Sequence, residues 1–283
     1  MQGGIGVDWN WLQSLIFGFL SGFSEFLPVS SEAHQILFVQ LTGAGNEVLG
    51  FRLLCHVAML VALLLSCRPH LSRLARERRL SGSARRKRKR QPDVRSVFEL
   101  RILRTAAFVV LLSFVEYPAA STIADTLWIL ALVMTVNGII LFLPQFFPSG
   151  NKEAQSMSAL DALVTGLGGA LAVLPGISRI GCMNTAGRLR GCDGRYIVDI
   201  ALLLCIPALV VLIGFDIYGI FIAESIFSLS LILHYILATA AAFAGAYFGI
   251  VLLRFLAVRV GFAGFAYYCW GVALFTFILY LTI

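Results

Sequence analysis

Four side chains that can do chemistry lie close together near the start of the chain, in a stretch that is otherwise apolar. Glu25, Ser30, Ser31 and His34 supply a carboxylate, two hydroxyls and an imidazole within the apolar run 12–41. Polar groups at membrane depth are costly, so they usually face a cavity and serve binding, transport or catalysis. Ser31 and His34 are three positions apart, which puts them on one face of a helix. This spacing suits a nucleophile with a proton-transfer partner.

A second polar group follows much later in the chain, in residues 175–179, which read PGISR. An arginine beside the free N–H groups of a helix N-terminus is a receptor for anions, phosphate in particular. We therefore predict substrate binding by Ser30, Gly176, Ser178 and Arg179. If the two groups meet, they can hydrolyse a phosphoanhydride. The predicted catalytic residues are Ser31 as nucleophile, with a water molecule as the alternative, His34 as acid and base, Arg179 for charge stabilisation, and Glu25 either to orient His34 or to bind a metal.

The composition predicts an integral membrane protein. Of the 283 residues, 59% are hydrophobic and only 13% are charged, whereas soluble domains carry about 25% charge. The apolar segments have the length of membrane-spanning helices. The six cysteines form no CxxC pair or Cys/His cluster, so we expect buried, reduced thiols.

The apolar segments predict an all-α polytopic membrane protein, a single membrane domain over 1–283. We expect two stretches that proline and small or polar residues interrupt, 12–42 and 158–190, to form re-entrant helical hairpins. Six other stretches are close to the length that a bilayer requires. These six predicted transmembrane helices are 51–67, 99–116, 125–146, 195–214, 229–253 and 260–282.

The basic residues predict the orientation. The segment 68–98 carries twelve Lys and Arg residues and should be cytoplasmic, as a partly disordered loop near anionic lipid. The remaining topology then puts twenty of the 22 basic residues on the same side, with Arg52 and Arg179 as exceptions. Nucleic-acid binding by this segment is the minor alternative, and we expect no nucleic-acid partner.

A weak internal repeat accompanies the two interrupted stretches. At an offset of 147 the chain matches Gly22 with Gly169, Leu27 with Leu174, Pro28 with Pro175, and Ser31 with Ser178. The two halves have opposite predicted orientations, which is typical of an inverted-topology repeat with its site at the midplane. We predict a first repeat over 9–146 and a second over 158–283.

At these residues the sequence resembles the undecaprenyl-diphosphate phosphatase family, the bacitracin-resistance type. The matching motifs are SGFSEFLPVSSEAH at 21–34 and PGISRIGCM at 175–183. The resemblance implies an inverted-repeat fold with two re-entrant hairpins in the bacterial cell membrane, and a site that opens towards the outer face. It also implies hydrolysis of undecaprenyl diphosphate to the monophosphate carrier of cell-wall synthesis. Divalent cations (Mg2+ or Ca2+) would support the activity, with no organic cofactor. The implied functional residues are Glu25, Ser30, Ser31, His34, Ser178 and Arg179.

The sequence departs from the family pattern at several positions. Ser21 stands where the family has a glutamate, and Ile180 and Met183 replace two hydroxyl residues. Glu32 is an additional carboxylate, but only a minor candidate to replace the lost one, because Ser21 and Glu32 do not share a position on a helix. Asn184 and Thr185 are candidates to replace lost hydrogen bonds. These departures keep two alternatives open, a transporter or flippase for polyprenyl-phosphate lipids and a catalytically impaired binding paralogue.

The expected partners are a polyprenyl diphosphate lipid and the bilayer, with a homodimer as a candidate assembly. Two further histidines, His56 and His234, stand alone in apolar spans and are interpreted as packing or interfacial residues. Asp161 and Asp199 lie near the predicted cytoplasmic ends of helices. We expect them to serve those helix N-termini rather than catalysis.

Overall fold

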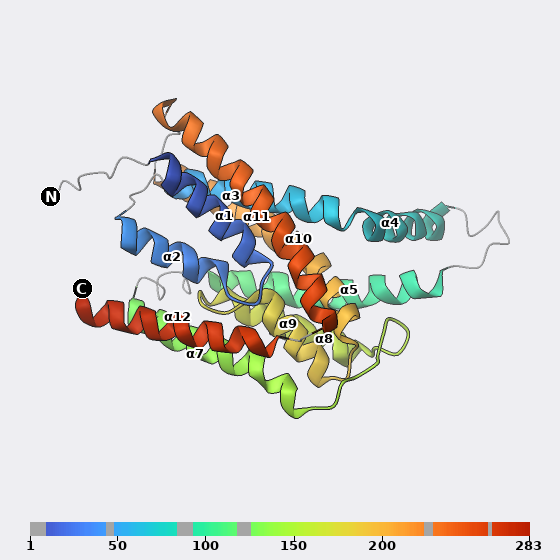
Figure 1. Ribbon diagram of the computed structural model, residues 1–283. Helices are drawn as coiled ribbons and strands as arrows, with labels where there is room; N and C mark the ends of the chain where they lie inside the picture. Colours follow the sequence, from blue (N-terminus) through green and yellow to red (C-terminus); the bar gives the residue numbers. More distant parts are fainter. Residues whose placement is uncertain (1–9, 44–47, 84–92, 118–125, 224–228, 260–261) are drawn as a thin grey trace.

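The protein is a bundle of helices (Figure 1). The computed structural model describes residues 10–43, 48–83, 93–117, 126–223, 229–259 and 262–283. Over these residues the only extended pairing is an isolated bridge between Lys152 and Cys192. Five helical stretches of the described chain are long and apolar enough to cross a membrane. They are Val48–Ser66, Leu127–Phe146, Gly194–Ile222, Ile232–Ala257 and Ala263–Thr282.

These five stretches agree with five of the six predicted spans. They comprise α3 (Val48–Ser66), α7 (Leu127–Phe142) with η2 (Leu143–Phe146), α10 (Gly194–Ile222), α11 (Ile232–Arg259) after η4 (Leu229–Leu231), and α12 (Ala263–Thr282). The sixth predicted span, 99–116, falls on α5 (Val94–Ser113) and η1 (Phe114–Glu116). Residues 94–104 of α5 include four charged residues, Arg95, Glu99, Arg101 and Arg104, so α5 is not among the apolar stretches and its role as a span stays a prediction.

The first interrupted stretch forms two short helices, α1 (Trp11–Glu25) and α2 (Ser31–Thr42). α1 begins at Asn10, which forms a capping box with Gln13. It ends ahead of Pro28 because proline lacks an N–H group and disfavours helical geometry in the residue before it. After the break α2 runs back towards the end of the molecule where α1 began (Figure 1).

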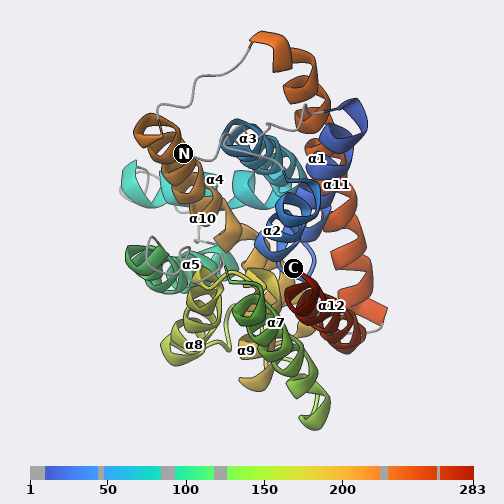
Figure 2. The ribbon, with the colours of Figure 1, turned by 90° about the vertical axis from the view of Figure 1, so that its left-hand side faces the viewer.

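The second interrupted stretch folds in the same way from the opposite end. It forms α8 (Ala159–Ala170), η3 (Leu171–Val173) and α9 (Arg179–Leu189), with the break at Pro175. Gly176 has a φ of +107° there, a value that favours glycine. The two breaks point towards each other in the middle of the bundle (Figures 1 and 2).

α1 packs very closely against α11. A Cβ atom at Gly18 would lie 2.1 Å from the carbonyl oxygen of Ala238, and one at Gly22 would lie 2.1 Å from that of Ala242. Small residues at both surfaces let the two backbones approach, as is common between membrane helices. This contact fixes the position of Glu25, one turn after Gly22.

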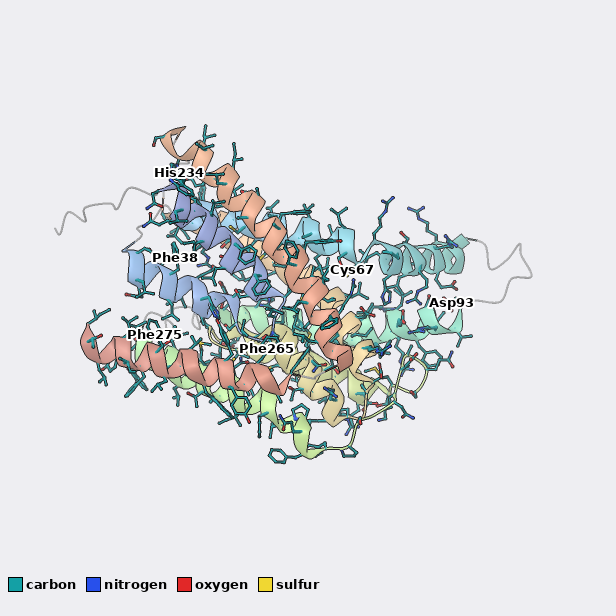
Figure 3. All side chains as sticks on the ribbon, viewed as in Figure 1. Phe38, Cys67, Asp93, His234, Phe265 and Phe275 are labelled. Atoms are coloured by element: carbon teal, nitrogen blue, oxygen red, sulfur yellow. The ribbon has the colours of Figure 1, made fainter. Side chains whose placement is uncertain are left out.

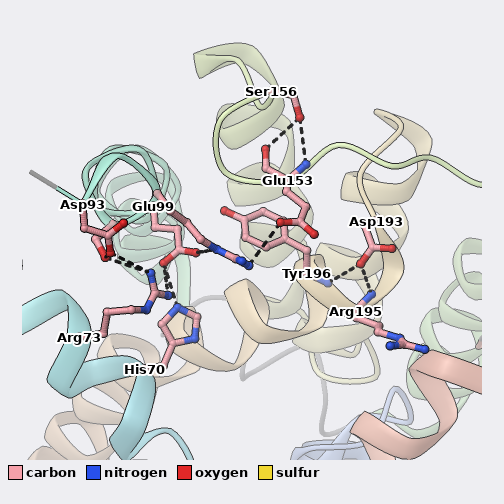
Figure 4. A network of polar contacts seen from close by, with 11 residues as sticks. His70, Arg73, Asp93, Glu99, Glu153, Ser156, Asp193, Arg195 and Tyr196 are labelled. Atoms are coloured by element: carbon pink, nitrogen blue, oxygen red, sulfur yellow. Dashed lines mark hydrogen bonds and ion pairs between the residues drawn. The ribbon is translucent and has the colours of Figure 1, made fainter.

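The basic segment 68–98 was expected to be a loop, and for residues 68–83 that prediction is wrong. They form α4 (Arg68–Ser83), which continues outward from α3 and protrudes from the bundle together with the first part of α5 (Figures 1 and 3). Residues 84–92 lie outside the described part. Glu99 of α5 is fully buried and accepts hydrogen bonds from His70 at 3.0 Å and Arg73 at 2.5 Å (Figure 4). These bonds hold α4 against α5, since a buried carboxylate requires charged partners.

Other basic residues gather at the same end of the molecule. Arg95 bonds both Glu99 and Glu153. Asp161 pairs with Lys152 at 3.3 Å and with Arg190 at 2.7 Å. It also forms the capping box of α8 with Ser158, which confirms its predicted place at a helix N-terminus.

Candidate active site

The two helix breaks are joined by direct hydrogen bonds. The N–H of Gly176 donates to the hydroxyl of Ser30 at 3.1 Å, and the hydroxyl of Ser178 donates to the carbonyl of Leu27 at 3.2 Å. Asn137 of α7 is completely buried and bonds both breaks. Its Oδ1 accepts from the N–H of Ser178 at 2.9 Å, and its Nδ2 lies 3.5 Å from the carbonyl of Pro28. One polar side chain in an apolar helix therefore links residues 150 positions apart.

The break before α2 is conformationally strained. Ser30 has a φ of +65° and is the only residue other than glycine with a positive φ in the described part of the chain. Such strain persists only where the surroundings enforce it, and it clusters at functional sites. Ser30 occupies the N-cap position but makes no capping bond, because its hydroxyl faces Gly176 instead.

Glu25, Ser31 and Arg179 form a continuous polar chain between the two breaks. The hydroxyl of Ser31 donates to Oε2 of Glu25, and Nη1 of Arg179 donates to Oε1 of the same carboxylate at 3.2 Å. Arg179 is also held over the ring of Phe114, 5.6 Å from its centroid, by a cation–π contact. All three polar side chains are buried, so the carboxylate is neutralised within the protein and not by solvent.

These groups line a small cavity. Its volume is about 20 Å3, which is room for about one water molecule. The polar lining combines predicted site residues from both repeats with Glu32 and His56, which were not among the predicted site residues. The full lining is Glu25, Ser30, Ser31, Glu32, His56, Ala172, Ile177, Ser178, Arg179 and Leu212.

His34 lies elsewhere and does not line this cavity. Its Nδ1 is 2.7 Å from the carbonyl oxygen of Ser30, and its Nε2 is 2.7 Å from the hydroxyl of Tyr268 on α12. The imidazole also stacks on the Tyr268 ring. Over the residues that the structure describes, Glu25 and His34 therefore do not form the predicted hydrogen bond. Glu25 instead bonds Ser31 and Arg179.

The sequence interpretation missed the far wall of the cavity. His56 of α3, expected to be a packing or interfacial residue, has its Nδ1 2.5 Å from Oδ2 of Asp216 on α10. Arg52, one turn earlier, lies 3.7 Å from the other oxygen of Asp216 and donates to the Tyr117 hydroxyl at 3.1 Å. Tyr117 in turn donates to Glu32 at 3.1 Å. The i, i+4 spacing of Arg52 and His56 was the signal available in the sequence.

The departures from the family pattern have different consequences. Glu32 lines the cavity with Glu25, so it restores a second carboxylate to the site. Ser21 is buried, and its hydroxyl has no partner among the described residues. Asn184 likewise has both amide atoms buried without a described partner. Thr185 bonds the carbonyl of Ile140. Neither Asn184 nor Thr185 is among the residues that line the cavity.

Comparison with known proteins gives matches along most of the chain. The family model described as "Bacitracin resistance protein BacA" matches residues 14–275. The "Undecaprenyl-diphosphatase" of Methanobrevibacter smithii is 30% identical over 272 residues, which cover 94% of this chain and 96% of the relative. The "Undecaprenyl-diphosphatase 1" of Shouchella clausii is 30% identical over 274 residues, covering 94% and 95%. The "Undecaprenyl-diphosphatase" of a Nocardioides species is 30% identical over 205 residues, covering 71% and 72%.

Proposed function

Because the chain belongs to the bacitracin resistance protein BacA family, we propose that it is a membrane phosphatase. It hydrolyses undecaprenyl diphosphate to undecaprenyl phosphate and so recycles the lipid carrier of cell-wall synthesis. The observation that carries the residue assignment is the buried chain Ser31–Glu25–Arg179 between the two breaks. It combines an anion receptor with a hydroxyl that already donates its proton to a carboxylate.

In the proposed reaction Arg179 binds the terminal phosphoryl group and stabilises its developing charge. The hydroxyl oxygen of Ser31 forms a bond to that phosphorus, and Glu25 takes the hydroxyl proton. The bridging P–O bond breaks, and its electron pair leaves on undecaprenyl phosphate. Water then hydrolyses the phosphoserine, Glu25 returns its proton to Ser31, and inorganic phosphate departs. Ser30, Gly176 and Ser178 hold the two breaks in register.

The assignment of His34 as acid and base stays a prediction. Its ring must leave the Tyr268 hydroxyl, 2.7 Å from Nε2, before it can reach the cavity. The two carboxylates in the lining, Glu25 and Glu32, also fit a divalent cation. Mg2+ commonly binds one or two carboxylates together with substrate phosphates. When bound, such a cation neutralises charge on the diphosphate. No cluster of three His, Cys, Asp or Glu side chains suited to a metal occurs in the described part of the chain, so we propose that the cation arrives with the substrate.

An apolar groove beside the site is our proposed position for the prenyl tail. The groove has a volume of about 760 Å3 and is lined by residues of α5, α7, α8 and α9. Leu171, Val173 and Leu174 face the groove, whereas Ala172 and Ile177 line the polar cavity. The segment 171–177 therefore separates the place of the tail from the place of the diphosphate.

The proposed architecture is six transmembrane helices and two re-entrant hairpins in an inverted repeat. The order of helices supports it, because at the offset of 147 the bounds of α1 and α2 fall within two residues of those of α8 and α9, and the start of α3 falls within one residue of the start of α10. Corresponding helices also pack alike: α1 packs on α11 of the second half, and α8 packs on α5 of the first. We further propose a bacterial cell membrane location with α4 in the cytoplasm and the site towards the outer face. The homodimer stays a prediction that cross-linking in membranes tests.

Phosphate release from undecaprenyl diphosphate by the purified protein tests the function. We expect release by the wild type, and loss of at least 100-fold in Arg179→Ala. Arg101→Ala is the matched control, because Arg101 is exposed on α5 and its loss should leave the rate unchanged. Equal rates for wild type and Arg179→Ala would refute the site assignment. Movement of the lipid across vesicles without phosphate release would favour the flippase alternative, and lipid binding with neither release nor movement would favour the impaired paralogue.

A further inference from the structure

A second buried ionisable pair, outside the motifs that carry the family resemblance, is formed by His56, which lines the cavity, and its partner Asp216. His56 is 1% exposed and Asp216 is 4% exposed, yet the two side chains meet at 2.5 Å. Buried ionisable groups are costly at membrane depth unless they have partners and a role. A purely structural role would require only that the polar atoms be satisfied. His56 does more than this, because it lines the same cavity as Ser31 and Arg179.

The hydrogen bonds orient the imidazole. Asp216 holds Nδ1, so Nε2 is the ring nitrogen left for the cavity, and no described residue hydrogen-bonds it. A carboxylate on Nδ1 fixes the tautomer in which Nε2 accepts a proton, and it stabilises the imidazolium that results. The cavity that His56 lines has room for about one water molecule.

The charged groups around His56 come from several helices. Asp216 of α10 bonds its Nδ1, and Arg52 of α3 lies 3.7 Å from Asp216. Glu25 of α1, Glu32 of α2 and Arg179 of α9 line the same cavity as His56. The Asp216 carboxylate is the charged group that contacts the ring, so it stabilises the ring when the ring carries a proton.

We propose that His56 is a catalytic base of the phosphatase and that Asp216 positions it; this inference rests on the proposed function. In the second half of the reaction a water oxygen forms a bond to the phosphoserine phosphorus, and Nε2 of His56 takes the water proton. The P–O bond to Ser31 breaks, and the Ser31 oxygen receives the proton that Glu25 holds. Inorganic phosphate leaves, and His56 then releases its proton to solvent.

The pH dependence of kcat for phosphate release tests this assignment. The wild type should lose activity at acidic pH, where the base is protonated. In His56→Gln we expect kcat to fall by about 100- to 10,000-fold and the acidic limb to disappear. Asp216→Asn removes a stabiliser of the imidazolium, so its acidic limb should move to lower pH with a smaller loss of rate. His234→Gln is the matched control and should keep both the rate and the limb.

The outcomes separate the two proposals. If the wild type releases no phosphate, the proposed function fails. If the wild type is active and His56→Gln keeps the rate or the acidic limb, the role of His56 is refuted. If His56→Gln does not fold, Asp216→Asn decides: a limb that moves supports the assignment, and an unmoved limb overturns it. Loss of the limb in His34→Gln, with its retention in His56→Gln, would assign the base to the family-motif histidine instead.

Discussion

The Glu25–Arg179 ion pair should determine stability as well as activity. Both side chains are buried, with exposed fractions of 6% and 8%, and they meet at 3.2 Å. Arg179→Met leaves the carboxylate of Glu25 without its cation, and Glu25→Gln leaves the guanidinium without its anion. Breaking a buried pair by removing one partner costs about 3–5 kcal/mol of unfolding free energy. At roughly 2–4 °C per kcal/mol, each single variant should melt about 10 °C below the wild type.

The double variant Glu25→Gln/Arg179→Met distinguishes an ion pair from two unrelated positions. It leaves no uncompensated charge, so it should recover most of the lost melting temperature while phosphate release stays abolished. Thermal unfolding in one detergent, at one protein concentration, measures all four proteins. If the double variant melts as low as the sum of the two single losses, the side chains do not interact and the geometry of the site is refuted.

Three further predictions concern the scaffold. Gly22→Ala should lower the melting temperature, because the new Cβ would lie 2.1 Å from the carbonyl oxygen of Ala242. Gly271→Ala is the control, because a Cβ there has no atom within 4 Å. Its higher helix propensity should raise the free energy of unfolding by up to about 1 kcal/mol and so raise the melting temperature slightly. Asn137→Ala should lower both melting temperature and activity, because it removes the side chain that bonds both breaks, and an unchanged protein would contradict this link. Burial raises the pKa of the Cys192 thiol to about 11, so the thiolate is scarce at pH 8. In a variant that retains only this cysteine, maleimide labelling should be slow until the protein is denatured.

The apolar spans were predictable because bilayer thickness fixes the length of a spanning helix. The main error in length concerns α10, which runs to Ile222 and not to residue 214. The predicted span ends two residues before Asp216, which the helix includes as a buried residue. The helix continues because Arg52 and His56 of α3 partner that carboxylate inside the bundle. The contact of α3 with Asp216 therefore explains both why α10 continues past residue 214 and why His56 lies at the site.

The basic segment shows the opposite limit. Residues 68–83 are rich in arginine, with a glutamate and leucines, and such residues favour helix, but isolated helices are marginal in water. α4 is held by hydrogen bonds from His70 and Arg73 to Glu99, which lies 29 and 26 residues later in the chain. Neither the burial of Glu99 nor its partners can be read from the local sequence.

The two halves of the site were predicted to meet, but the partner of each side chain was not. The helical period placed Ser31 and His34 on one face of a helix, but two residues on one face can still contact different neighbours. In the structure Ser31 faces Glu25, while His34 turns to Tyr268, an interaction across 234 positions. Glu32 was only a minor candidate for the missing acid, because helical spacing separates it from Ser21. It reaches the cavity through the break between α1 and α2, where helical spacing no longer holds.

The closed geometry identifies the group that must move when substrate binds. A cavity of about 20 Å3 does not admit a phosphoryl group. The backbones of both breaks are fixed by Asn137 and by the bonds of Ser30 and Ser178, so the adjustment falls on side chains. Arg179 is held by one ion pair and one aromatic contact. A phosphate can replace Glu25 as its anionic partner with no loss of compensation. That exchange releases Glu25 at the moment when it is needed to take the proton of Ser31, so binding of the diphosphate activates its own nucleophile.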